Sequence, residues 1–233
     1  MNPMTPVSLN SGGTDAGVSA SQRNRVLRNT YWLLALSMVP TVLGAWIGVS
    51  TGIASAMSPG IGLIVFLGGA FAFMFAIEKT KNSAAGVPVL LGFTFFMGLM
   101  LSRLVGQVLG LANGASLVML AFAGTGTIFL GMAGLSSVIK RDLSSMGKFL
   151  FIGAVMLLVA GIANVFIQSS ALMITLSVLA IGIFSAFILH DLKRVQDGFE
   201  TNYISATLSV YLSIYNVFQS LLALLGLTSG RDE

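Results

Sequence analysis

Residues 149–167 read FLFIGAVMLLVAGIANVFI, a stretch in which Asn164 is the only strongly polar side chain. A helix needs about 20 mostly apolar residues to cross roughly 30 Å of hydrocarbon, so this stretch is long enough to span a membrane. Period-two alternation is absent, and backbone groups inside lipid must be satisfied within the segment, so we predict an α-helix and not a barrel strand. Seven such stretches follow one another, at approximately 30–50, 60–77, 87–109, 115–137, 148–168, 171–190 and 204–227.

The composition of the whole chain agrees with this interpretation. Hydrophobic residues make up 55% of the sequence and charged residues only 9%, whereas a soluble domain typically carries about 25% charged residues. Too little polar surface remains to coat a soluble globule of 233 residues. The composition therefore excludes a soluble enzyme and predicts an all-α integral membrane protein with seven transmembrane helices.

The segments outside the spans are short. Residues 1–22 are rich in Ser, Gly, Asn and Thr, a composition that cannot bury enough apolar surface to fold, so we expect a flexible cytoplasmic tail. We expect the seven-helix transmembrane domain to cover residues 23–229 and a short C-terminal tail to cover residues 230–233. The function should therefore lie within the helical bundle or on its short loops.

The basic residues indicate the orientation in the membrane. If the seven spans alternate in direction, ten of the 12 Lys and Arg residues fall on one side of the membrane: Arg23, Arg25, Arg28, Lys79, Lys81, Lys140, Arg141, Lys148, Lys193 and Arg194. The other two are Arg103 and Arg231. Cytoplasmic loops carry an excess of Lys and Arg. The pattern predicts a cytoplasmic N-terminus and a C-terminus on the far side of the membrane.

Small residues recur at a spacing of four in two spans. They are Gly44, Gly48 and Gly52 in the first span, and Gly98, Ser102, Gly106 and Gly110 in the third. Such rows let helix backbones approach closely in lipid. The rows fit either close packing within one bundle or a dimerisation face, and we favour packing within the bundle.

The seventh span carries polar residues at steps of three or four, which places them on one face of the helix. This buried polar stripe consists of Ser205, Ser209, Ser213, Asn216 and Ser220. A polar face turned to lipid is costly, so we expect the stripe to face other helices or a wet cavity. The last helix is therefore predicted to be central, with six helices surrounding it. The stripe serves either as hydrogen-bonding contacts between helices or as the lining of an ion or proton path.

Few ionisable residues lie near the membrane interior. Asp191 closes the sixth span and is either a boundary charge offset by the basic residues that follow it, or a gate that senses pH or ions. His190 beside it is a candidate pH-responsive group. Arg103 is an intramembrane charge that either extends its side chain to the nearby interface or pairs inside the bundle.

Known catalytic patterns do not fit the chain. The sequence has no Cys and a single His, so multi-histidine and thiolate metal sites are excluded. Asp191 has no partner carboxylate for an aspartyl dyad, and the His-Glu-x-x-His and Gly-x-Ser-x-Gly motifs are missing. We therefore expect no enzymatic activity, no cofactor and no metal site.

Several segments together resemble one known family. They are RNTY at 28–31, FTFFMGL at 93–99, KRDLSSMGK at 140–148, IFSAFILHD at 183–191 and YLSIYNVF at 211–218. In combination they resemble the Bax inhibitor motif family of seven-span membrane proteins, over residues 25–227. The resemblance implies six helices around a seventh and, for its bacterial members, a location in the inner (plasma) membrane with the C-terminus in the periplasm.

The resemblance implies two functions. It is greatest to a bacterial branch that modulates the membrane-bound, ATP-dependent protease FtsH, which makes FtsH the expected partner. Other members are pH-sensitive calcium leak channels that use two aspartates at the cytoplasmic end of the bundle. Asp191 matches the first aspartate, whereas Ser213 stands where the second is common. A carboxylate and a hydroxyl bind calcium weakly, so the family resemblance favours protease modulation, with an ion leak as the alternative.

Overall fold

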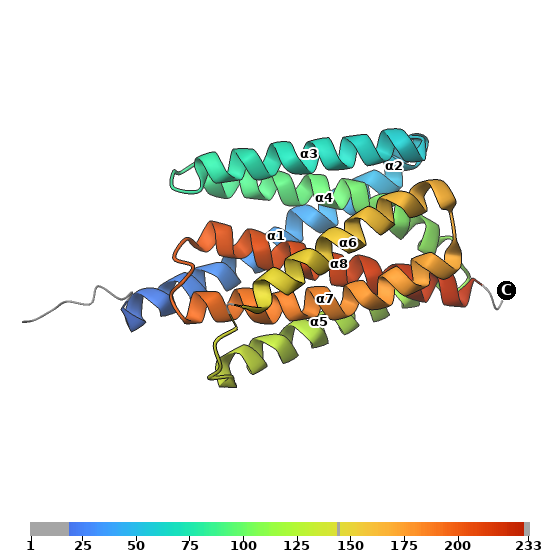
Figure 1. Ribbon diagram of the computed structural model, residues 1–233. Helices are drawn as coiled ribbons and strands as arrows, with labels where there is room; N and C mark the ends of the chain where they lie inside the picture. Colours follow the sequence, from blue (N-terminus) through green and yellow to red (C-terminus); the bar gives the residue numbers. More distant parts are fainter. Residues whose placement is uncertain (1–18, 144, 231–233) are drawn as a thin grey trace, which may run out of the picture.

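The computed structural model describes residues 19–143 and 145–230, and this part of the chain is helical (Figure 1). The helices are α1 (Ala20–Thr51), α2 (Ile53–Ala56), α3 (Pro59–Thr80), α4 (Gly86–Leu109), α5 (Gly114–Val138), α6 (Met146–Ile167), α7 (Ser170–Gln196) and α8 (Tyr203–Ser229). All except the one-turn helix α2 are long and apolar enough to cross a membrane. The predicted all-α fold with seven transmembrane helices is confirmed.

The first helix begins earlier than its apolar segment. The Ser19 hydroxyl accepts a hydrogen bond from the Gln22 backbone N–H at 3.2 Å and caps the N-terminus of α1, which satisfies one of the unpaired donors there. Residues 20–22 are therefore helical, although we expected the tail to extend to residue 22. The remainder of that expected tail, residues 1–18, and the last residues, 231–233, lie outside the described part of the chain.

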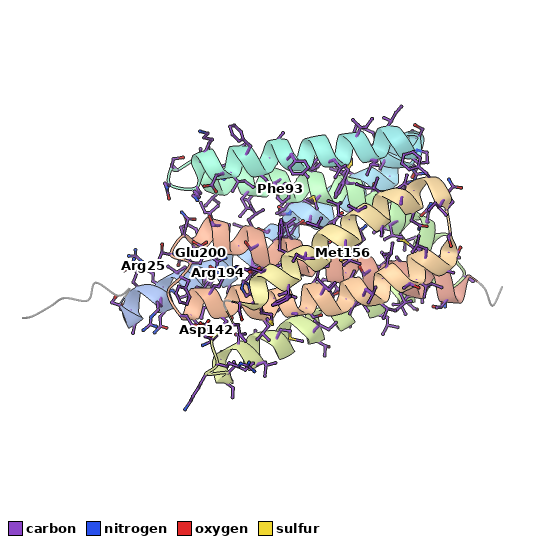
Figure 2. The ribbon with its side chains drawn as sticks, viewed as in Figure 1. Arg25, Phe93, Asp142, Met156, Arg194 and Glu200 are labelled. Atoms are coloured by element: carbon purple, nitrogen blue, oxygen red, sulfur yellow. The ribbon has the colours of Figure 1, made fainter. Side chains whose placement is uncertain are left out.

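The helices form an elongated bundle with two different ends (Figure 1). The start of α1 and the α3–α4, α5–α6 and α7–α8 connections lie at one end, and the end of α8 lies at the other. The ten basic residues that the sequence assigned to one side belong to the first end, which we call the basic end. Arg25, Arg194, Asp142 and Glu200 mark it in Figure 2.

Helices α1 and α4 pack with their backbones in contact. A Cβ atom added at Gly44 would collide with the Phe95 carbonyl oxygen, and one added at Gly98 would collide with the Thr41 carbonyl oxygen. A Cβ at Gly48 would collide with the Ser102 side chain. These small residues are therefore used for packing inside one bundle, the interpretation that we favoured.

Helix α8 contributes much of the core. It packs against α1, α4, α5 and α7, and its Val210, Val217 and Leu222 side chains are fully buried. Helix α6 is peripheral, because it packs mainly on α7 and Leu150 is its buried residue. The arrangement of six helices around a central α8 stays a prediction.

Polar contacts between α8 and its neighbours come from a face of tyrosine and threonine side chains. The Tyr211 hydroxyl lies 2.9 Å from Thr41 Oγ1 on α1 and donates to the Thr94 carbonyl of α4 at 3.4 Å. The Tyr215 hydroxyl donates to the Met97 carbonyl at 3.3 Å. These hydrogen bonds join α8 to α1 and α4 on a face adjacent to the serine stripe.

Candidate functional site

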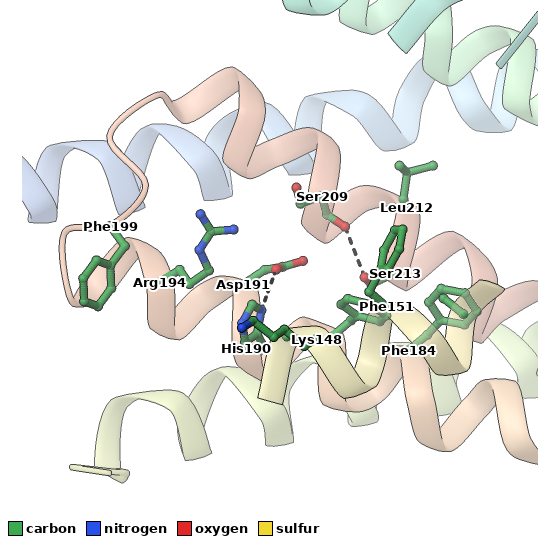
Figure 3. A pocket seen from close by; sticks show the side chains of 13 residues that line it. Lys148, Phe151, Phe184, His190, Asp191, Arg194, Phe199, Ser209, Leu212 and Ser213 are labelled. Atoms are coloured by element: carbon green, nitrogen blue, oxygen red, sulfur yellow. Dashed lines mark hydrogen bonds and ion pairs between the residues drawn. The ribbon is translucent and has the colours of Figure 1, made fainter. Parts of the chain in front are cut away.

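A pocket of about 680 Å³ lies at the basic end between α6, α7 and α8 (Figure 3). We call it the α6–α8 pocket. Its lining consists of Gly147, Lys148, Phe151, Ala154, Phe184, Phe187, His190, Asp191, Arg194, Phe199, Ser209, Leu212 and Ser213. The pocket therefore combines charged, hydroxyl and aromatic side chains in one space.

Asp191 and His190 form the most polar part of this pocket. His190 Nδ1 lies 3.0 Å from Asp191 Oδ1, and the two side chains are only 8% and 13% exposed. Gly147 on α6 lies against the imidazole, since a Cβ there would approach His190 Nε2 to 2.8 Å. The lack of a side chain at Gly147 thus lets α6 cover the pair. The pocket wall thus holds a carboxylate and an imidazole that are both largely shielded from solvent.

The structure divides the predicted serine stripe. Ser209 and Ser213 line the pocket, and the Asp191 carboxylate points toward the side that they form (Figure 3). The buried Ser213 hydroxyl donates to the Ser209 carbonyl at 3.1 Å. Ser213 thus lies in the same pocket as Asp191.

The other stripe residues lie outside this pocket lining. Ser205, Asn216 and Ser220 are half-buried, and the Asn216 amide donates to the Leu212 carbonyl of its own helix at 2.8 Å. The hydrogen bonds between α8 and its neighbours described above come from Tyr211 and Tyr215 instead.

Arg103 belongs to the other end of the molecule. Its Nη1 donates to the Met57 carbonyl oxygen, in the connection between α2 and α3, at 3.2 Å. The guanidinium thus holds a turn of the chain far from the pocket. In residues 19–143 and 145–230, no group of three or more His, Asp or Glu side chains is arranged to hold a metal ion.

Sequence reasoning missed some of the pocket. It treated Lys148 and Arg194 as loop charges and did not single out Phe151, Phe184 or Phe187. The signal on α7 was available, because Phe184, Phe187, Asp191 and Arg194 recur every three or four residues and so share one helical face. The contribution of α6 depends on how α6 packs against α7, which its sequence does not reveal.

Comparison with known proteins assigns the chain to a family. A family model described as inhibitor of apoptosis-promoting Bax1 matches residues 23–230. The chain belongs to the Bax inhibitor family. A membrane protein of Vibrio cholerae is 36% identical over 91% of this chain and 93% of its own length. A protein of Neisseria meningitidis serogroup A is 37% identical over 90% of this chain and 94% of its own.

One relative in the Bax inhibitor family has a name that states a function. The protein named Modulator of FtsH protease YccA, from Escherichia coli K12, is 36% identical over 90% of this chain and 92% of its own length. The similarity therefore extends over about nine-tenths of each chain.

Proposed function

We propose that this protein binds and modulates the membrane-bound, ATP-dependent protease FtsH in the bacterial inner membrane. The observation that supports the proposal is the similarity to YccA, which extends over nearly the full length of both chains. A second E. coli relative, 36% identical, carries the name inner membrane protein YccA. The family description and the YccA name denote an inhibitor and a modulator, which supports a role without catalysis.

The packing of α1 suggests how modulation works. An ATP-driven protease begins to pull at an unfolded segment, and the composition of residues 1–18 predicts such a segment directly before α1. Pulling there must first separate α1 from α4, where Gly44 and Gly98 bring the two backbones into contact. The Tyr211–Thr41 hydrogen bond adds to this resistance. The protein then occupies the protease as a substrate that unfolds slowly.

The test uses purified FtsH, a second membrane substrate and the full-length protein. We expect the full-length protein to co-purify with FtsH in mild detergent and to slow degradation of the second substrate. Deletion of residues 2–18 should remove most of this inhibition, whereas a scrambled segment of equal length should keep it, because the mechanism requires only an unfolded segment. Equal inhibition by the truncated protein contradicts the mechanism, and failure to co-purify contradicts FtsH as the partner.

The α6–α8 pocket favours a second candidate function, a pH-sensitive ion leak. The pocket contains Asp191, His190 and Ser213 at the end of the bundle that carries the basic residues. We expect ion flux into liposomes to depend on pH and to fall several-fold in Asp191→Asn. Asp197→Asn is the matched control, because Asp197 is also near the end of α7 but pairs with Lys193 at 2.7 Å, outside the pocket. Equal flux from the wild type and Asp191→Asn at every pH removes Asp191 from the mechanism.

A further inference from the structure

The α6–α8 pocket changes in polarity with depth. Lys148 lies at the start of α6 and Arg194 near the end of α7, so both cations belong to the mouth of the pocket. Ser213 lies about ten residues into α8, which corresponds to roughly 15 Å at 1.5 Å per residue. Phe184 is at least as far from the end of α7. The pocket therefore extends from the level of lipid headgroups into the hydrocarbon layer.

Among the residues that the structure describes, the two cations at the mouth have no anionic partner. The ion pairs among the described residues join Lys81 to Glu78, Lys193 to Asp197 and His190 to Asp191. Lys148 and Arg194 are exposed and belong to none of them. Asp191, the carboxylate in the pocket, is held by His190. The mouth therefore offers two positive charges that remain available to an anion.

The deeper part of the pocket is aromatic and open to its surroundings. Phe151 lines the pocket and is still 66% exposed, because α6 lies at the periphery of the bundle. Phe151 lies within the apolar part of α6, where an exposed side chain contacts lipid, so an acyl chain can reach it from the bilayer. Phe184 and Phe187 stack with their ring centroids 5.9 Å apart and form the inner wall. Between mouth and wall, Ser209 is an exposed residue with a hydroxyl group.

We propose that the α6–α8 pocket binds an anionic phospholipid. The phosphate pairs with Lys148 and Arg194, the glycerol esters lie near the Ser209 hydroxyl, and the first part of an acyl chain packs on Phe151, Phe184 and Phe187. This order of cation, hydroxyl and aromatic groups matches the order of phosphate, ester and hydrocarbon in the lipid. A volume of about 680 Å³ is within the usual range for ligand pockets, roughly 300–1,000 Å³, and the rest of the lipid stays in the bilayer. The proposal does not depend on FtsH.

The test measures lipid binding to full-length protein in detergent by native mass spectrometry, with thermal stability as a second readout. Phosphatidylglycerol is compared with phosphatidylcholine of the same acyl chains. We expect at least tenfold tighter binding of phosphatidylglycerol and a concentration-dependent rise in Tm. The double variant Lys148→Gln/Arg194→Gln should lose this preference. Lys79→Gln/Lys140→Gln is the control, because it removes two charges from the basic end outside the pocket.

Two further measurements distinguish a lipid-binding site from non-specific electrostatic attraction between anions and the basic end. Ala154→Phe keeps both cations and fills the acyl part of the pocket, so it should weaken phosphatidylglycerol binding about tenfold. Glycerol phosphate, which has the anion without the chains, should not raise Tm. The proposal is overturned if the two lipids bind equally well, or if the pocket and control double variants lose phosphatidylglycerol binding to the same extent. It is also overturned if Ala154→Phe binds phosphatidylglycerol as well as the wild type does, or if glycerol phosphate raises Tm as much as the lipid.

Discussion

Tyr211 shows how single residues hold α8 in place. Its side chain is 1% exposed, its ring packs edge-on against Phe93, and its hydroxyl contacts both α1 and α4. A buried hydroxyl without a partner is costly, so each of these contacts restricts the rotation of α8. The rotation of α8 about its axis decides whether Ser209 and Ser213 face the pocket.

Tyr211→Phe tests this contribution. The substitution removes the hydroxyl, keeps the ring and leaves Thr41 with one hydrogen bond fewer, so we expect a loss of stability of about 1 kcal/mol, the usual scale for such bonds in membrane proteins. Thermal unfolding in detergent is the measurement. Tyr31→Phe is the control, because the Tyr31 ring packs on Phe129 and its hydroxyl forms no hydrogen bond among the described residues. Equal effects of the two variants would show that the Tyr211 hydroxyl has no special role.

The chemistry of single residues made part of the site predictable. Asp191 and His190 stood out because ionisable groups are rare in membrane spans. Ser213 stood out because it belongs to a stripe of polar residues on one face of the last span. The phenylalanines did not, since a side chain that lines a pocket and one that faces lipid are the same residue type in the same apolar stretch. The roles of Tyr211 and Tyr215 could not be predicted either. Their hydroxyl groups donate to backbone carbonyl oxygens of another helix, and every residue type has such an oxygen.

At the scale of helices, the contact between α1 and α4 leaves no room for added atoms. Gly98→Ala should push α1 away from α4, because the new Cβ would meet the Thr41 backbone carbonyl and lie 3.0 Å from the Ala45 N atom. Overpacking against backbone typically costs about 1–3 kcal/mol. We therefore expect Tm in detergent to fall by several degrees.

Gly131→Ala is the matched control for Gly98→Ala. Gly131 lies within a membrane span, α5, but a Cβ there would meet no atom within 4 Å. Alanine is also the better helix former, so stability should stay the same or rise slightly. A similar loss in both variants would attribute the effect to glycine in general and not to the contact between α1 and α4.

The helices were predictable because the bilayer selects apolar segments of a certain length. The ends of the helices were less predictable. Helix α7 continues to Gln196, beyond the predicted end at residue 190, and α2 was not expected at all. Hydropathy reports contact with lipid, whereas a helix can continue into water once its hydrogen bonds have formed. Gly52, with a φ of 69°, ends α1 in the left-handed conformation that favours glycine, and α2 follows directly.

For the whole molecule, the asymmetry of charge predicts the orientation. We place the basic end in the cytoplasm and the end of α8 in the periplasm. Alkaline phosphatase fused to the C-terminus should therefore be active and a fluorescent protein fused there should be dark. Fusions after Lys81, in the connection between α3 and α4, should give the reverse result. A bright C-terminal fluorescent fusion contradicts this orientation.

The packing of α1 on α4 also has a consequence for biogenesis. Gly98 is synthesised roughly 50 residues after Gly44, and α3, which lies between them in the sequence, must enter the bilayer first. At about 5–20 residues per second, α1 waits roughly 3–10 s before the surface that covers its glycines exists. During that interval its small-residue groove is open to lipid and to the helices of other newly made proteins. A membrane insertase or chaperone that shields the groove would therefore act on nascent chains that end before α4, and longer chains would no longer need it.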